Sequence, residues 1–81
     1  MSRLRNLSDP DVVRIFAEFE FVIASQRGSH VKLRRVLSDG TRQTLTIPNH
    51  RELDTGTLRA IYRQALRYIA DDDLRLYFYS D

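Results

Sequence analysis

A length of 81 residues, 42% of them hydrophobic and 30% charged, predicts one folded domain over residues 1–81 and excludes a disordered chain. With no cysteine, no apolar leader and no run of membrane-spanning length, the sequence excludes a disulfide framework and a membrane partner, so we expect a cytoplasmic protein. Residues 27–51 contain six cationic residues and one aspartate, a net charge of +5, whereas residues 71–81 contain one cationic residue and four aspartates, a net charge of −3. The basic segment either binds nucleic acid or an acidic partner, or is a solvated face.

The first element is predicted to be a helix over residues 10–20. Ser8 has the side chain of a helix N-cap, and Asp11 follows three residues later as its capping-box partner. Apolar residues then recur at helical spacing, at Val12, Phe16 and Phe19. The β-prone residues 21–25 predict a short first strand directly after this helix.

Two further strands are predicted over residues 31–37 and 43–47, joined by a hairpin turn. The turn carries Asp39-Gly40, which tolerates the positive φ of tight hairpins, and Pro48 ends the last strand because it lacks an N–H. Side chains along a strand point alternately to opposite faces, so the strand over residues 31–37 has one apolar and one cationic face. The apolar face holds Val31, Leu33 and Leu37, and the other face holds His30, Lys32 and Arg34.

A long helix is predicted from the Gly56-Thr57 pair to about residue 69. Its apolar residues recur at helical spacing, at Leu58, Ile61, Tyr62, Ala65 and Ile69. Its opposite face carries a stripe of arginines, Arg59, Arg63 and Arg67. The order of one helix, three strands and a second helix predicts an α+β domain of two layers, with a three-stranded antiparallel sheet and both helices on one face.

The tail over residues 71–81 has two interpretations. The aspartates at 71–73 favour a last helical turn through Leu74 and Leu76. The aromatic residues at 77–79 are then expected to seal the edge of a small core. The alternative is that they form a docking segment for a partner, since exposed apolar patches usually mark contacts.

Several short motifs, taken in their order along the chain, are those of one protein family. They are Gly28-Ser29-His30, Asp39-Gly40, Thr46-Ile47-Pro48-Asn49-His50, Gly56-Thr57-Leu58 and Gln64-Ala65. With these motifs and the leading helix, most of the chain resembles the HicA family of bacterial toxin–antitoxin mRNA interferases. The resemblance implies a double-stranded-RNA-binding-like fold, RNA cleavage through the histidine of Gly-Ser-His, and neutralisation by a HicB antitoxin. Glu20 stands where this family usually has a glycine, and Leu66 replaces another, which favours a helix that continues to about residue 69.

The resemblance places the catalytic role on His30. An unperturbed histidine titrates near pH ~6.5, so it can act as a general base or a general acid at cellular pH. RNA carries its own nucleophile, the 2′-OH, so a ribonuclease needs a base, an acid and cations for the developing negative charge. Lys32 and Arg34 lie on the same strand face and are candidates for phosphate contacts, as are Gly28 and Ser29 at the preceding bend. Without the resemblance, His30 is more simply a hydrogen-bonded turn histidine.

His50, the only other histidine, lies in the loop before the second helix. It is predicted to bind RNA or to order its loop, and the alternative is that it supplies a second proton-transfer group. Two histidines without cysteine or clustered carboxylates make a poor metal site. The sequence also lacks a phosphate-cradling glycine loop and a dinucleotide fingerprint. We therefore expect a metal-independent reaction with no small-molecule cofactor.

The sequence leads to functions of different classes. The first is an endoribonuclease toxin that cleaves mRNA, with His30 as general acid–base. Its expected RNA contacts are Gly28, Ser29, Lys32, Arg34, His50, Arg59 and Arg63. A HicB-like antitoxin is expected to cover His30, Lys32 and Arg34, with Arg59 and Arg63 as flanking contacts. The alternatives are a non-catalytic module that binds RNA by its shape and backbone, and a protein-interaction module that acts through its aromatic tail.

Overall fold

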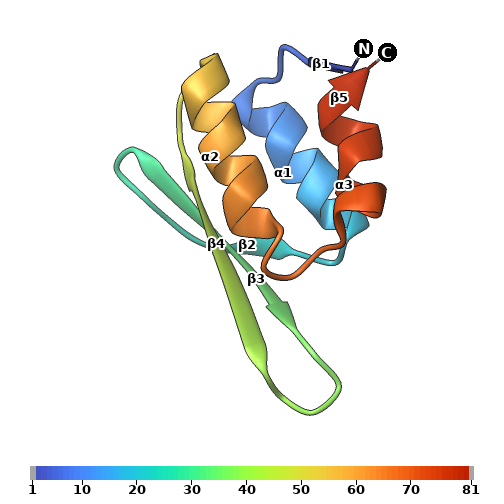
Figure 1. Cartoon of the computed structure of the whole chain (residues 1–81). Coiled ribbons are helices and arrows are strands. Elements are labelled where there is room, and N and C mark those ends of the chain that lie inside the picture. The colour runs from blue at the N-terminus through green and yellow to red at the C-terminus, as the bar shows by residue number, and fades with distance from the viewer. Residues whose placement is uncertain (1, 81) are drawn as a thin grey trace.

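The computed structural model describes residues 2–80. The elements in chain order are β1 (Arg3–Leu4), α1 (Asp9–Glu18), β2 (Val22–Arg27), β3 (His30–Val36), β4 (Arg42–Pro48), α2 (Thr55–Ala65), α3 (Asp71–Phe78) and β5 (Tyr79–Ser80). The predicted order of helix, three strands and helix is confirmed from α1 to α2, and α3 contains the helical turn expected in the tail, whereas β1 and β5 are additional elements. Figure 1 shows the helices grouped together and the β3–β4 hairpin projecting away from them (Figure 1).

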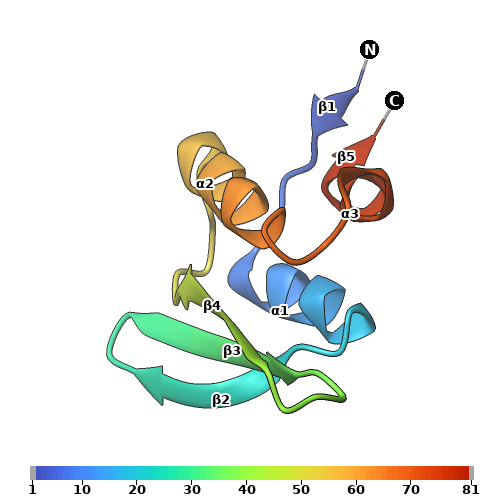
Figure 2. The ribbon, with the colours of Figure 1, turned by 60° about the horizontal axis from the view of Figure 1, so that its bottom comes forward.

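The sheet has the strand order β2-β3-β4, with every neighbouring pair antiparallel. All three helices lie on the same side of it (Figure 2). The side chains that fill the covered face are buried, namely Val31, Leu33, Leu45 and Ile47. They form one core with the apolar residues of the helices. The predicted α+β class, with helices on one sheet face, is therefore confirmed.

The edges of the predicted strands differ from the structure by one or two residues. The first predicted strand corresponds to β2, which begins after the buried Phe21 and continues to the Gly28-Ser29 turn. The Asp39-Gly40 hairpin is confirmed: Gly40 has a φ of +87°, and the Asp39 carboxylate accepts a hydrogen bond from the Thr41 N–H. The prediction for Leu37 is wrong, because 37% of its surface is exposed. Leu37 follows the last residue of β3, where the hairpin has passed beyond the helices that would cover it (Figure 1).

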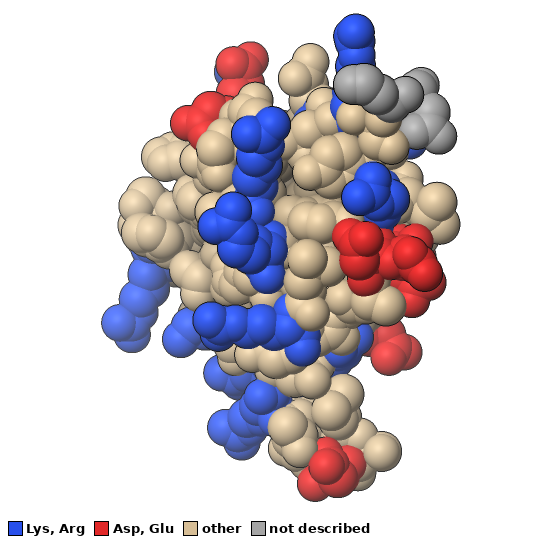
Figure 3. All heavy atoms as spheres, in the orientation of Figure 1, with Lys and Arg blue, Asp and Glu red and all other residues tan. Residues whose placement is uncertain are grey.

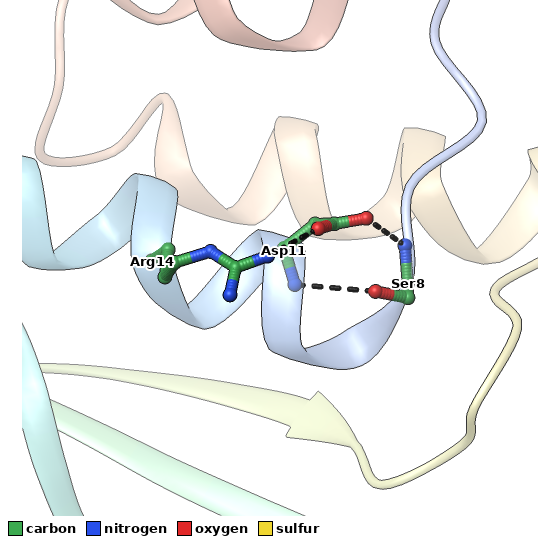
Figure 4. A network of polar contacts seen from close by, with 3 residues as sticks. All are labelled: Ser8, Asp11 and Arg14. Atoms are coloured by element: carbon green, nitrogen blue, oxygen red, sulfur yellow. Dashed lines mark hydrogen bonds and ion pairs between the residues drawn. The ribbon is translucent and has the colours of Figure 1, made fainter.

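The start of α1 confirms the predicted capping box. The Ser8 Oγ accepts a hydrogen bond from the Asp11 N–H at 3.3 Å, and the Asp11 carboxylate accepts one from the Ser8 N–H at 2.9 Å (Figure 4). Asp11 also pairs with Arg14 at 2.6 Å. Hydrogen bonds from the Ser8 backbone and side chain, and the contact with Arg14, lower the pKa of Asp11. An N-cap of this kind typically contributes about 1 kcal/mol to helix stability.

The end of α1 comes two residues earlier than predicted, at Glu18. The Phe21 N–H donates to the Phe16 carbonyl and the Glu20 N–H donates to the Ala17 carbonyl, both at 3.0 Å. This pair of bonds is a Schellman motif, which places Glu20 in the left-handed region with a φ of +69°. The rings of Phe16 and Phe21 then meet edge to face, with centroids 6.1 Å apart. The turn therefore delivers the chain from α1 into β2.

The prediction that the second helix continues to about residue 69 is wrong, because α2 ends at Ala65. The next residues form turns, and Ile69 is buried there without belonging to the helix. Arg35 of β3 contacts this turn from the sheet. Its guanidinium donates to the carbonyls of Phe19 and Tyr68 and lies over the Phe21 ring, 4.7 Å from the centroid.

The tail forms α3, a helix of eight residues with three aspartates in its first turn. Leu74 and Phe78 are fully buried, and the Phe78 ring contacts those of Phe16 and Tyr62. The expectation that this segment seals the core is confirmed at Phe78, which is therefore not part of an exposed docking segment. Neighbouring Leu76 remains 71% exposed. Beyond α3, β5 pairs with β1 in antiparallel register, so the two ends of the described chain lie side by side (Figure 2).

Candidate functional site

The side of the sheet away from the helices, here called the outer face, is where the candidate residues of β3 lie. Partners across an antiparallel sheet share a face, so the strand register defines three rows on it. The first row is Arg27, His30 and Pro48, the second is Ser25, Lys32 and Thr46, and the third is Val22, Arg34 and Thr44. His30 and Lys32 are exposed and Arg34 is partly buried. The predicted alternation of β3 is thus confirmed for His30, Lys32 and Arg34.

His30 is the first residue of β3, directly after the turn that joins β2 to β3. Gly28 opens this turn with a φ of +51°, a conformation that glycine adopts without strain. The Ser29 Oγ lies 3.4 Å from the Nδ1 atom of His30. The Ser29 carbonyl also accepts a hydrogen bond from the Asn49 N–H, so the turn is fastened to the residue that follows β4. The imidazole is therefore exposed, while the backbone before it is held by this hydrogen bond to Asn49.

A hollow of about 410 Å³ opens beside His30 on the outer face. Its lining combines one imidazole, two cations and two hydroxyls, contributed by Ser25, Arg27, His30, Lys32 and Thr46. Within residues 2–80, no carboxylate lies at ion-pair distance from Arg27, Lys32 or Arg34. Cations without an acidic neighbour keep their charge available for an anionic ligand such as a phosphate. The site is thus suited chemically to binding phosphate next to a proton-transfer group.

A second group of cations lies on α2. Arg59 and Arg63 are exposed along the helix, as predicted, whereas Arg67 is exposed in the turn that follows it. The neighbouring Gln64 packs against the edge of the sheet, where its side-chain amide exchanges hydrogen bonds with the N–H and C=O of Thr46. The arginine stripe therefore lies next to β4, and Figure 3 shows Lys and Arg side chains over α2 and the hairpin, with acidic side chains over α3 (Figure 3).

His50 is placed apart from His30. It lines a different hollow, of about 440 Å³, at the start of α1 together with Asp9, Asn49 and Arg51. Asp9 is almost completely buried, and desolvation raises its pKa while the nearby His50 opposes that rise. The structure therefore groups His30 with Gly28, Ser29, Lys32 and Arg34, whereas His50 belongs to the α1 side and Arg59 and Arg63 belong to α2. Nothing in this placement makes His50 a second proton-transfer group for His30.

Sequence reasoning missed Arg27, Ser25 and Thr46 as members of the site. The signal for Arg27 was present, because a two-residue turn at Gly28-Ser29 pairs the residues on either side of it. Ser25 was hidden by a bulge in β2 between Ile23 and Ser25, which shifts the register by one residue. No feature of the sequence alone fixes the position of such a bulge.

The described residues include no group of three or more His, Cys, Asp or Glu side chains arranged to hold a metal ion. In the part of the chain that the structure describes, no helix has both the length and the apolar character needed to cross a lipid bilayer.

The fold and the site together define a small basic α+β domain with one exposed histidine on a cationic sheet face. A family model described as the HicA toxin of bacterial toxin–antitoxin systems matches residues 10–66, which is 57 of the 81 residues. The chain belongs to the HicA toxin family. Neither the curated proteins nor the solved structures gave a match. The matched region covers α1 through α2 and leaves α3 and the β1–β5 pair outside. Members of this family are RNase toxins that act with a cognate antitoxin.

Proposed function

We propose that this protein is an endoribonuclease toxin that cleaves mRNA in the cytoplasm, with His30 as its general acid–base. The observation that supports this most directly is the hollow on the outer face, where an exposed imidazole lies between the cations Arg27 and Lys32. A group that exchanges protons near neutral pH, next to cations that hold a phosphate, is what cleavage of an RNA backbone requires. Membership in a toxin family is consistent with this reading.

The proposed reaction uses the 2′-OH of the substrate as its nucleophile. His30 accepts the proton of the 2′-OH while the 2′ oxygen attacks phosphorus. The bond from phosphorus to the 5′ oxygen breaks, and the leaving oxygen takes up a proton, which gives a 2′,3′-cyclic phosphate and a free 5′-OH. Lys32 and Arg34 stabilise the negative charge that develops on the phosphoryl oxygens. Because the nucleophile belongs to the substrate, no metal ion is needed to generate it.

Substitution of His30 tests this proposal directly. The purified protein should cleave a single-stranded RNA in the presence of EDTA, and His30→Ala should lower the cleavage rate by roughly 10²- to 10⁴-fold. It should also relieve growth inhibition in cells. The variant should fold normally, because the His30 side chain is exposed and its hydrogen-bond partner in this turn is the neighbouring Ser29 side chain. Circular dichroism and the Tm verify the fold.

His50→Ala is the matched control, since it removes the other imidazole from a different hollow. If His50 contacts RNA, its loss should raise KM and leave kcat near the wild-type value. Cleavage at the wild-type rate by His30→Ala would remove His30 from the mechanism. Cleavage that is abolished by EDTA and restored by a divalent cation would contradict the metal-independent reaction.

A second candidate function is a non-catalytic RNA-binding module. The specific observation in its favour is that the hollow is lined by a single imidazole and no carboxylate, so no separate acid and base face each other there. In that case RNA would bind and remain intact, and the affinity would be the same in His30→Ala. The first candidate is preferred because the chain belongs to a toxin family.

The proposed mode of inhibition is direct occlusion. A HicB-like antitoxin would cover His30, Lys32 and Arg34 on the outer face, and Arg59 and Arg63 of α2 would provide flanking contacts. The arginine stripe and the outer face adjoin at β4, which allows one partner surface to reach both. Complementary acidic charge on the antitoxin would accelerate its association. Inhibition then needs no change in the fold of the toxin.

A further inference from the structure

The polar side chains of β3 are regularly spaced along the outer face, and the proposed cleavage does not by itself require this spacing. His30, Lys32 and Arg34 occupy alternate positions of β3, so their side chains form a line along one face. Two residues of a strand span roughly 7 Å. One nucleotide of an extended RNA strand covers a similar distance. A single RNA strand lying along β3 could therefore present successive phosphates to successive members of this line.

We propose that the outer face is a track for single-stranded RNA, in which the backbone lies along β3 and Arg27 holds the phosphate that faces His30. The proposal rests on the function proposed above and specifies its substrate and its register. Lys32 and Arg34 then bind the next two phosphates. Arg27 is assigned the first because it is the direct cross-strand partner of His30 and lines the same hollow. Its planar guanidinium can hold two phosphate oxygens at once.

Hydroxyl groups lie on both sides of the line formed by His30, Lys32 and Arg34. Ser25 of β2 and Thr46 of β4 are the cross-strand partners of Lys32, and Thr44 is the partner of Arg34. A ribose attached to a phosphate at Lys32 would lie within the same row. Its 2′-OH can both donate to and accept from a protein hydroxyl, and this group distinguishes RNA from DNA. Ser25 and Thr46 are therefore the residues assigned to recognition of the ribose.

The composition of the sheet indicates that the backbone is read and the bases are not. β2, β3 and β4 contain no Phe, Tyr or Trp, so the His30 imidazole is the one ring that the outer face offers for stacking with a base. Contacts to phosphate and sugar fix position and carry no sequence information. Cleavage should therefore depend little on the base sequence. The track contacts one RNA backbone, which favours a single strand as substrate.

Arg27→Ala tests the assignment, with Arg67→Ala, in the turn after α2, as a matched control of equal charge. Binding of a 12-nucleotide RNA is measured in the His30→Ala background, so that no cleavage interferes. Arg27→Ala should weaken binding by roughly 10- to 100-fold, because it removes a charged hydrogen bond. It should also reduce the slope of the logarithm of the binding constant against the logarithm of the salt concentration by about 0.7, the contribution of one phosphate on a single strand. Arg27→Lys should recover part of the affinity, and Arg67→Ala should change it little.

The hydroxyls are tested by the double variant Ser25→Ala and Thr46→Val in the same background. Its affinity for RNA should fall roughly 2- to 10-fold, while its affinity for DNA of the same sequence should not change. A duplex RNA should compete poorly with the single strand. Equal losses for RNA and DNA, a duplex that competes fully, or equal effects of Arg27→Ala and Arg67→Ala would each overturn the track.

The failure of the track is distinguishable from the failure of the enzyme. Wild-type protein that cleaves RNA while Arg27→Ala binds and cleaves normally refutes the track and leaves the ribonuclease. Protein that never cleaves RNA, yet loses single-strand binding on Arg27→Ala, refutes the ribonuclease and leaves the track.

Discussion

Glu20 is the one residue other than glycine with a positive φ among residues 2–80. It occupies the left-handed position of the Schellman motif that ends α1 and directs Phe21 into the core. An L-residue in this conformation is disfavoured by about 1–2 kcal/mol, whereas glycine adopts it freely. The strain persists because the hydrogen bonds of the turn and the contact between Phe16 and Phe21 hold the backbone in place.

Glu20→Gly should therefore stabilise the protein. After allowing for the greater freedom of glycine in the unfolded chain, the expected gain is about 0.5–1 kcal/mol, or a rise in Tm of roughly 2–8 °C for a domain of this size. Thermal unfolding followed by circular dichroism measures the change. Glu20→Ala is the control and should give no such gain, because alanine still carries a Cβ. A Tm at or below that of the wild type for Glu20→Gly would contradict the strain.

Arg34 and Arg35 are neighbours on β3, but their side chains lie on opposite faces of the sheet and have different surroundings. Arg34 points to the outer face, whereas Arg35 points to the helices and bonds to Gln43, Phe19 and Tyr68. The sequence predicted the first placement from simple alternation. The same alternation places Arg35 on the side of the helices, but the sequence could not identify its partners, which come from three other segments of the chain.

Among the elements, α3 depends on an anchor at its first residue. The Tyr62 hydroxyl of α2 donates a hydrogen bond to the Asp71 carboxylate. Burial of the ring and this bond to Asp71 raise the pKa of Tyr62 from 10.0 to about 12. The neutral phenol is thus favoured in the folded protein, which binds this proton more tightly than the unfolded chain does.

This shift predicts a loss of stability at alkaline pH. Because the folded-state pKa lies above the unfolded value, the contribution of Tyr62 is complete below pH 10 and is lost as the pH rises towards about 12. Tyr62→Phe should lower the free energy of unfolding at pH 8 by about 1 kcal/mol, the typical value of one hydrogen bond, and should flatten its decrease above pH 10. Denaturant unfolding at both pH values measures the difference. An unchanged alkaline slope in Tyr62→Phe would assign the loss to other groups.

The ends of the helices show what periodicity can and cannot predict. The capping box at Ser8 and Asp11 is local, and the sequence predicted it correctly. The end of α2 was not predicted, because the apolar Ile69 suggested a helix that the structure replaces by a turn. Local signals thus predicted where helices begin, whereas apolar spacing did not predict where they end.

For the molecule as a whole, the sequence predicted the layer order and the side of the sheet on which the candidate residues of β3 lie. It did so because the alternation in β3 and the apolar spacing of α1 and α2 require only neighbouring residues. The β1–β5 pair and the pairing of β3 with β4 depend on contacts between distant segments. Thr46 consequently entered the site only through the structure, whereas the local turn at Gly28-Ser29 already carried the signal for Arg27.

The occlusion proposal makes a prediction at the scale of the whole surface. The double reversal Lys32→Glu and Arg34→Glu should weaken RNA binding and antitoxin binding together, because both ligands would compete for the same positive face. The affinity for RNA should show the steeper salt dependence, since it arises from counterion release. Calorimetry with the cognate antitoxin and with a single-stranded RNA measures both. Loss of RNA binding with an unaltered affinity and association rate for the antitoxin would place the antitoxin elsewhere.

The pairing of β1 with β5 gives the fold a mechanical weak point. Arg3 lies opposite Ser80, and Leu4 lies opposite Tyr79, so a force that pulls the two ends apart opens this short ladder like a zipper, one bond after another. The next element to yield would be α3, whose removal uncovers the Phe16 and Tyr62 rings that Phe78 contacts.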